Sequence, residues 1–283
     1  MAVASALVSF YVTYLGYRNL KSAVPVLRPE TFDGQLTDWD RALFAGNDPA
    51  AMLHTVLGTG ISAEILAVVY MVFFYFVLAS LALALVFLPP RRGIFYVTAL
   101  SINWGLGAAS YYVFPALGPI YAEPSAFADL PSTRVSGLQD VLIRQRLEFL
   151  SDPTAPGVHQ GIGAFASLHT SIVFTAAVAA HLLRLDRRLK IGLWGLFGLT
   201  TLATIYLGWH YVLDDVAGIA IALAALGLAA ALTDFKLGVA WRPQVLRRAR
   251  AAKRRAAAQA AQAGPAVPAK RPVAETTSGS DAA

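Results

Sequence analysis

The sequence contains no cysteine. A disulfide framework is therefore excluded, as are a thiolate metal site and a cysteine nucleophile. Histidine is scarce as well, with five in the chain. Any nucleophilic or metal-binding chemistry must come from these few histidines together with carboxylates and hydroxyls.

Charge is the next scarce property. Only 14% of the 283 residues are charged, whereas soluble globular proteins carry about 25%. Apolar residues make up 57% of the chain, and the mean hydropathy is +0.55. This composition argues against a soluble protein. It also excludes an intrinsically disordered chain, which needs low hydrophobicity and high charge.

Long apolar runs take the place of charge. A membrane-spanning helix needs about 20 mostly apolar residues, and six segments approach or exceed that length with at most one charge each. They are residues 2–17, 61–88, 94–117, 165–183, 191–213 and 216–233. We expect the short first segment to be an anchor rather than a signal peptide, because no small-residue cleavage site follows it before Arg18. The sequence thus predicts an all-α integral membrane protein with six transmembrane helices.

The basic residues predict the orientation of these spans. The short loops 89–93 and 184–190 hold two and four basic residues, and the segment from Lys236 onward holds ten. Six spans place these regions on one side, and short basic loops stay in the cytoplasm. Both termini are therefore predicted to be cytoplasmic, in a multi-pass protein of the cell membrane.

The chain divides into two predicted parts. Residues 1–235 form the six-helix membrane domain, and residues 236–283 form a basic tail, rich in Ala and Pro, that we expect to be disordered. The net charge of +6 comes from this tail, which is better explained by contact with anionic lipid than by nucleic-acid binding. In the large outer loops, residues 38–44 and 139–150 have the spacing of amphipathic helices.

Two clusters of polar residues open the fourth and sixth spans, and the predicted topology places both at the outer membrane–water interface. The first is Ser167-Leu168-His169, and the second runs from His210 to Asp215. His210 and Asp214 are four residues apart and share a helix face. A carboxylate there accepts the Nδ1–H of the imidazole and leaves Nε2 as an aimed nucleophile. Asp215 is rotated by about 100° and is expected off this face.

The first cluster has the features of an anion site. Ser167 is at the N-cap position, where free backbone N–H groups and the helix dipole favour a phosphate. His169 follows closely and could protonate a leaving oxygen. These features predict phosphoryl transfer through a phosphohistidine. Alternatives are a solvated helix end, or a metal site built from both histidines and Asp214. Trp209 and Tyr211 are expected to be interfacial aromatics.

The two clusters resemble signatures of the type 2 phosphatidic acid phosphatase superfamily, and most closely its inositol phosphorylceramide synthase-like branch. That branch has Ser-Leu-His, a His-Tyr-x-x-Asp step, and a Tyr-x-x-x-Pro-x-x-Gly-Pro motif, which here covers residues 111–119. The resemblance spans about residues 1–233. It implies that His210 is the nucleophile, Asp214 its orienting partner and His169 the general acid, with no metal or other cofactor.

The sequence departs from the superfamily pattern at the phosphate-binding cations. The arginine six residues before the nucleophile is Thr204 here, and the first signature, Lys-x6-Arg-Pro, is absent near Tyr112. A literal copy occurs as Lys21-x6-Arg28-Pro29, either by chance or as a relocated cation site. Six basic residues on the outer side are therefore candidates for the phosphate cation: Lys21, Arg28, Arg41, Arg134, Arg144 and Arg146.

The predicted function is removal or transfer of a phosphate or phosphoryl headgroup from a lipid phosphate or phospholipid. The acceptor is water in a phosphatase, or an alcohol in a headgroup transferase, and the motifs do not separate the two. The alternative is a non-catalytic membrane protein or transporter. An inverted hydropathy repeat would favour a transporter, and the sequence shows none.

Overall fold

The computed structural model describes residues 2–236, and all regular elements within that range are helical. The predicted basic tail lies outside the described residues, apart from Lys236. Ten α-helices and one 3₁₀ helix follow one another along the described chain. They are α1 (Ala2–Leu27), α2 (Asp33–Leu43), α3 (Pro49–Leu57), α4 (Ile61–Phe87), α5 (Pro90–Val113), α6 (Pro119–Ala122), η1 (Pro124–Phe127), α7 (Arg134–Ser151), α8 (Leu168–Leu182), α9 (Arg187–Tyr206) and α10 (Val212–Leu232).

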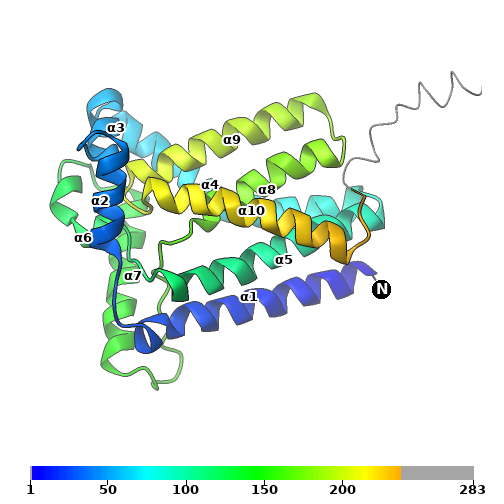
Figure 1. Ribbon diagram of the computed structural model, residues 1–283, viewed down its shortest axis with the longest axis horizontal. Helices are drawn as coiled ribbons and strands as arrows, with labels where there is room; N and C mark the ends of the chain where they lie inside the picture. The colour runs from blue at the N-terminus through cyan, green and yellow to red at the C-terminus, as the bar shows by residue number, and fades with distance from the viewer. Residues whose placement is uncertain (1, 237–283) are drawn as a thin grey trace, which may run out of the picture. The chain divides into compact units, whose positions relative to one another are not determined.

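The helices α1, α4, α5, α8, α9 and α10 form a bundle (Figure 1). α5 packs against α1, α10, α8 and α4, and α8 also packs against α9 and α10. The core of the bundle is apolar, with Phe95, Leu100 and Ile172 fully enclosed. The remaining α-helices, α2, α3, α6 and α7, gather at one end of the bundle, at the left of Figure 1. The bundle thus has one end covered by additional helices, which is where α8 and α10 begin.

Three of the described helices, α4, α9 and α10, are long and apolar enough to cross a membrane, and α8 is a shorter apolar helix. Large apolar side chains on these helices face outward. Examples are Ile61 at 80% exposed and Leu232 at 73%. Such surfaces are costly in water and suited to lipid. α1 and α5 have the length of spans but carry more polar residues, so six spans remain a prediction.

The helix ends differ from the predicted span ends. The run 191–213 stops as a helix at Tyr206, and α10 starts earlier than predicted, at Val212. Gly208 has a positive φ of 73° in the turn between them, a conformation that glycine adopts without steric cost. α8 starts at Leu168, three residues later than predicted, with Ser167 as its N-cap. Both differences leave the polar clusters in tight turns at helix starts.

The amphipathic segments are helical, as the sequence predicts, but longer. Residues 38–44 fall largely within α2, and residues 139–150 within α7. Asp33, Leu36, Thr37 and Asp40 form the buried face of α2. Two of these four residues are carboxylates, so α2 does not simply lay an apolar face on a membrane surface. It packs instead against the start of α10.

Candidate active site

His210 and Asp214 lie at the start of α10, where the chain leaves the Gly208 turn. Nδ1 of His210 lies 3.3 Å from Oδ2 of Asp214, and both side chains are buried. The same carboxylate oxygen accepts the backbone N–H of Tyr211 at 2.9 Å. A buried carboxylate with these two neighbours fixes the orientation of the imidazole.

His169 stands opposite, in the first turn of α8. Its Nδ1 lies 3.2 Å from Nε2 of His210. The other face of the ring packs against α4, where the ring centroids of Phe73 and Tyr70 are 4.3 and 4.7 Å away. Nε2 of His169 is buried in this aromatic surface with no hydrogen-bond partner. The aromatic side chains of α4 therefore determine which nitrogen of His169 faces His210.

The protons of the two rings follow from these contacts when Asp214 is ionised. The carboxylate then accepts from His210, which places the proton of the neutral His210 ring on Nδ1 and a lone pair on its Nε2. The 3.2 Å contact then requires His169 to donate from Nδ1. A lone pair and a transferable proton thus face the same point. This is the arrangement that a nucleophile and a neighbouring general acid need.

Ser167 is fully buried, and its hydroxyl accepts the N–H of Thr170 at 3.3 Å. Its own N–H donates to the carbonyl oxygen of Asp214 at 3.0 Å, which ties the starts of α8 and α10 together. The two helices approach closely because Gly218 of α10 lacks a side chain. An added Cβ there would collide with the Ser167 carbonyl. The predicted anion-binding serine therefore acts in this structure as the N-cap of α8, and its backbone links the two clusters.

Lys21 is the one of the six candidate cations that approaches the two histidines. It lies in α1, four residues beyond the predicted first span. Its Nζ is 4.7 Å from the centroid of the Tyr111 ring, a cation–π distance. Its charge lies close enough to interact with both His169 and His210. Desolvation lowers the pKa of Lys21 to about 7.

The segment after α7 connects Lys21 to the histidines. A Cβ added at Gly163 would lie 3.0 Å from Cε of Lys21 and 3.3 Å from the Tyr111 ring. The backbone of the next residue, Ala164, meets the ring of His210. Lys21 and His210 therefore pack on neighbouring residues of the loop between α7 and α8, although they are 189 positions apart in the sequence.

The other candidate cations have different partners or lie on the surface. Arg28 donates to the carbonyl of Tyr112 at 2.5 Å, and Arg41 pairs with Glu123 at 2.8 Å. Arg146 lies 3.5 Å from the side-chain oxygen of Gln160. Arg134 and Arg144 are exposed on α7. Of the literal Lys-x6-Arg-Pro copy, only the lysine is near the site.

Asp215 has a role that the spacing argument missed. It points away from His210, as expected, but it is buried rather than solvated. The hydroxyl of Thr170 donates to it at 2.5 Å and that of Thr204 at 3.3 Å. Thr204 occupies the position of the superfamily arginine. Here that position serves the packing of α8, α9 and α10 instead of supplying a positive charge.

The prediction that Trp209 and Tyr211 are interfacial aromatics is wrong. Both are buried, at 7% and 3% exposed. Trp209 stacks on Tyr70 with ring centroids 5.0 Å apart, and the hydroxyl of Tyr211 donates to Asp33 at 3.1 Å. Residues from the predicted outer loops help to enclose both rings: Tyr121 of α6 packs edge-on against Trp209, and Asp33 of α2 holds Tyr211.

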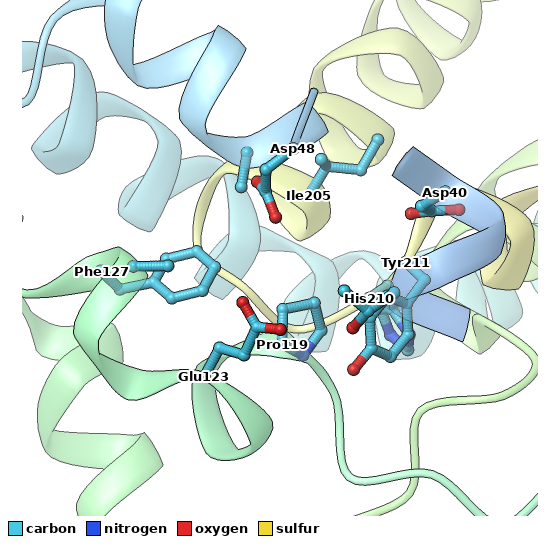
Figure 2. Close-up of a pocket in the computed structure, with 11 residues that line it drawn as sticks. Asp40, Asp48, Pro119, Glu123, Phe127, Ile205, His210 and Tyr211 are labelled. Carbon is cyan, nitrogen blue, oxygen red and sulfur yellow. The ribbon is translucent and has the colours of Figure 1, made fainter. Parts of the chain in front are cut away.

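A pocket opens beside His210 on the side of the outer helices (Figure 2). Asp40 of α2, Asp48 before α3 and Glu123 after α6 all line it, together with Tyr211. Each carboxylate has a protein partner: Asp48 caps α3, Glu123 pairs with Arg41, and Asp40 accepts two amides of α10. Negative charge on this side disfavours the approach of a phosphate, whereas Lys21 is on the side of α1 and α5.

A metal centre built from the two clusters does not fit this geometry. Asp214 meets Nδ1 of His210 while His169 meets Nε2, so the three side chains do not converge on one point. Throughout residues 2–236, no three His, Asp or Glu side chains are grouped as a ligand set for a metal ion. The successive contacts suit proton transfer from one side chain to the next better than coordination of a metal ion.

Comparison with known protein families gives a match to this chain. A family model described as the PAP2 superfamily matches residues 34–228, well over half of the chain. Comparisons with curated proteins and with solved structures give no match. The matched region runs from α2 into α10 and contains both polar clusters, whereas Lys21 precedes it. On the extent of this match, the chain belongs to the PAP2 superfamily.

Proposed function

We propose that the protein is a multi-pass enzyme of the cell membrane that removes or transfers a phosphate or phosphoryl headgroup from a lipid through a phosphohistidine. Membership of the PAP2 superfamily suggests a lipid phosphatase or phosphotransferase. The observation that carries the proposal is the chain of contacts from Asp214 through His210 to His169, with distances of 3.3 and 3.2 Å.

In the first half-reaction, the lone pair on Nε2 of His210 attacks the phosphorus of the lipid. The N–P bond forms as the P–O bond to the leaving group breaks. His169 enters this step as the imidazolium, gives its Nδ1 proton to the leaving oxygen and ends as a neutral ring. The carboxylate of Asp214 holds the Nδ1–H of His210 and stabilises the positive charge that develops on the ring. The substrate phosphorus occupies the gap between the two rings, which must separate to admit it.

In the second half-reaction, the hydroxyl of an acceptor attacks the phosphohistidine. His169 now takes the proton of this hydroxyl, the new P–O bond forms, and the N–P bond returns its electrons to Nε2. Water as acceptor gives hydrolysis. An alcohol gives headgroup transfer, as in the inositol phosphorylceramide synthase-like branch. Both outcomes use the same residues, so the acceptor is identified by its products.

Lys21 is our candidate for the cation that meets the phosphate. The superfamily arginine is replaced by Thr204, which bonds to Asp215, so the site needs positive charge from elsewhere. A partly desolvated ammonium near both histidines meets that need, because its attraction to an anion is stronger than in water. Ser167 contributes through the N-terminal turn of α8, where backbone N–H groups favour an anion.

The proposed site lies at the outer surface of the membrane. This follows from the basic loops, which predict both termini in the cytoplasm for six spans. The first residues of α8 and α10 then lie on the outer side, with α2, α3, α6 and α7 forming the outer cover. The lipid headgroup would enter at the interface while its chains remain in the bilayer.

The test is replacement of the proposed nucleophile. His210→Ala is expected to lower kcat at least ~10³-fold on any lipid phosphate that the wild type accepts. The matched control is His159→Ala, since His159 is exposed in a loop. Quenching the wild type during turnover of a phosphate-labelled lipid should trap an acid-labile phosphohistidine that His210→Ala lacks.

A His210→Ala enzyme that keeps a tenth of wild-type turnover would contradict the proposal. Mass spectrometry of the lipids in cells with and without the protein names the substrate. It also separates a dephosphorylated product from a lipid with an exchanged headgroup, and so decides between water and an alcohol as acceptor.

A further inference from the structure

The start of α10 is capped by another helix. An α-helix leaves its first backbone N–H groups without partners inside the helix. At α10 the N-cap residue is Tyr211, whose hydroxyl bonds to Asp33. Asp40 of α2 supplies the missing acceptors: Oδ2 accepts the N–H of Val212 at 2.7 Å, and Oδ1 accepts that of Leu213 at 3.2 Å.

This cap is a buried, charged contact. Asp40 is 3% exposed, and burial raises its pKa while the two amide donors act in the opposite direction. A carboxylate at a helix N-terminus is favoured by the helix dipole and by charge-assisted hydrogen bonds. Its position beside Tyr211 and His210 is visible in Figure 2. The exposed acidic residue of the same helix, Asp38, has no such contact with α10.

The capped residues lie between the two reacting side chains. Val212 and Leu213 lie, with Tyr211, between His210 and Asp214 in the sequence. A rotation of this first turn would therefore move the imidazole and its carboxylate together, and with them the 3.2 Å contact to His169. A displacement of about 1 Å in such a site can cost ~10²-fold in rate.

A second carboxylate on the same face of α2 braces the neighbouring loop. Asp33, seven residues before Asp40, accepts the N–H groups of Leu117 and Gly118 at 3.0 and 2.9 Å, in addition to the hydroxyl of Tyr211. Residues seven apart in a helix lie on one face. α2 therefore holds both the segment after α5 and the segment before α10.

We propose that Asp40 is a positioning residue of the phosphoryl-transfer site. Its carboxylate, on α2 of the same chain, caps the start of α10 and so fixes His210 and Asp214 relative to His169. The inference rests on the proposed function. It adds a residue of an outer helix, 170 positions before the nucleophile, that acts through the backbone and touches no reacting atom.

The first test is Asp40→Asn, with Asp38→Asn as the matched control on the exposed face of α2. The amide keeps one oxygen but turns an NH₂ group toward the second backbone N–H, and it removes the charge. Purified, monodisperse Asp40→Asn enzyme is expected to show a ~10–100-fold lower kcat with KM within about threefold of the wild type. Phosphohistidine formation per enzyme molecule should slow by the same factor. Asp38→Asn should match the wild type in both measurements.

The second test removes the donor instead of the acceptor. Val212 is the first residue of α10, a position where proline fits a helix and lacks only the N–H. Val212→Pro is therefore expected to keep the helix, lose the bond to Asp40, and lower kcat in the same way. This variant decides the question if Asp40→Asn does not fold.

The outcomes separate the two proposals. If the wild type forms no phosphohistidine, the proposed function fails. If the wild type forms it and the folded Asp40→Asn or Val212→Pro enzyme forms it at the wild-type rate, the positioning role of Asp40 fails while the proposed function stands. A role in folding alone would lower the yield of enzyme and leave the rate per molecule unchanged.

Discussion

Two adjacent carboxylates at the start of α10 face different partners. Asp214 is directed to the imidazole of His210, and Asp215 to the hydroxyls of Thr170 and Thr204. The 100° rotation between successive helical residues explains the separation. Consequently the first carboxylate belongs to the proposed chemistry, whereas the second stabilises the packing of three helices.

This difference leads to a paired prediction. Asp214→Asn should lower kcat by ~10³-fold or more, because an amide does not stabilise the developing imidazolium and can select the wrong tautomer. Asp215→Ala should instead lower thermal stability, since the buried Thr170 hydroxyl loses its carboxylate acceptor, at a cost of about 1–3 kcal/mol. The measurements are kcat per folded enzyme and the thermal midpoint in detergent. Comparable losses of kcat in folded Asp214→Asn and Asp215→Ala would show that the two roles are assigned wrongly.

The sequence predicts the local part of this site well. The i, i+4 spacing of His210 and Asp214 puts them on one helix face whatever the rest of the fold does, and the structure has them in contact. The burial of Asp215 is not predictable in this way. It depends on Thr170 and Thr204, which come from two other helices, and no local pattern reports their position.

Among the elements, α1 contributes beyond its predicted role as an anchor. It continues as a helix to Leu27 and brings Lys21 against Tyr111 of α5. The contact depends on the packing of α1 along α5, between residues 90 positions apart. The sequence gives Lys21 only as one of six candidates. Neither the charge of a residue nor its predicted side of the membrane specifies which cation packs near the two histidines.

The pKa of Lys21 gives α1 a testable signature. With a pKa of about 7, the ammonium loses its charge as the pH rises through that value, so kcat/KM should fall on the alkaline side. Lys21→Arg keeps its charge at all accessible pH values and should move this alkaline limb upward. Lys21→Ala should lower kcat/KM by ~10²-fold, of the order of one charge-assisted contact to the transition state.

Arg28→Ala is the control for this prediction. Arg28 has the same spacing to Pro29 as in the superfamily signature but bonds to the Tyr112 carbonyl and lies near Glu30. Its removal should leave the pH profile of kcat/KM unchanged. A pH profile that Lys21→Arg does not shift would move the search for the cation to Arg146, which is half-buried near Gln160.

At the scale of the whole molecule, hydropathy predicts the helices and the basic loops predict their orientation. The packing of the outer helices over the site depends instead on contacts between residues far apart in the sequence. α2 reaches the start of α10 across 172 residues of sequence to bond with Val212. The helices of the bundle are predictable from the apolar runs, because each apolar residue adds to the favourable free energy of transferring a helix into lipid. Contacts such as those of Asp33 and Asp40 arise only once the outer helices fold over the bundle.

The last prediction separates the basic tail from the site. α10 begins beside the two histidines and continues for 21 residues, so it ends about 30 Å from its start at 1.5 Å per residue. The proposed topology places the chain beyond it in the cytoplasm, across a hydrocarbon core of similar thickness.

Deleting residues 243–283 removes eight basic residues: Arg247, Arg248, Arg250, Lys253, Arg254, Arg255, Lys270 and Arg271. Turnover per correctly inserted molecule should stay within about twofold of the wild type, because the proposed site meets the phosphate on the outer side. Expression can fall, since juxtamembrane basic residues favour cytoplasmic retention, so insertion is measured first by protease protection in intact vesicles. A truncated enzyme with wild-type insertion and no turnover would contradict the outward-facing site. The two histidines and the tail lie beyond opposite ends of α10, so they could share a membrane face only if α10 does not cross the bilayer.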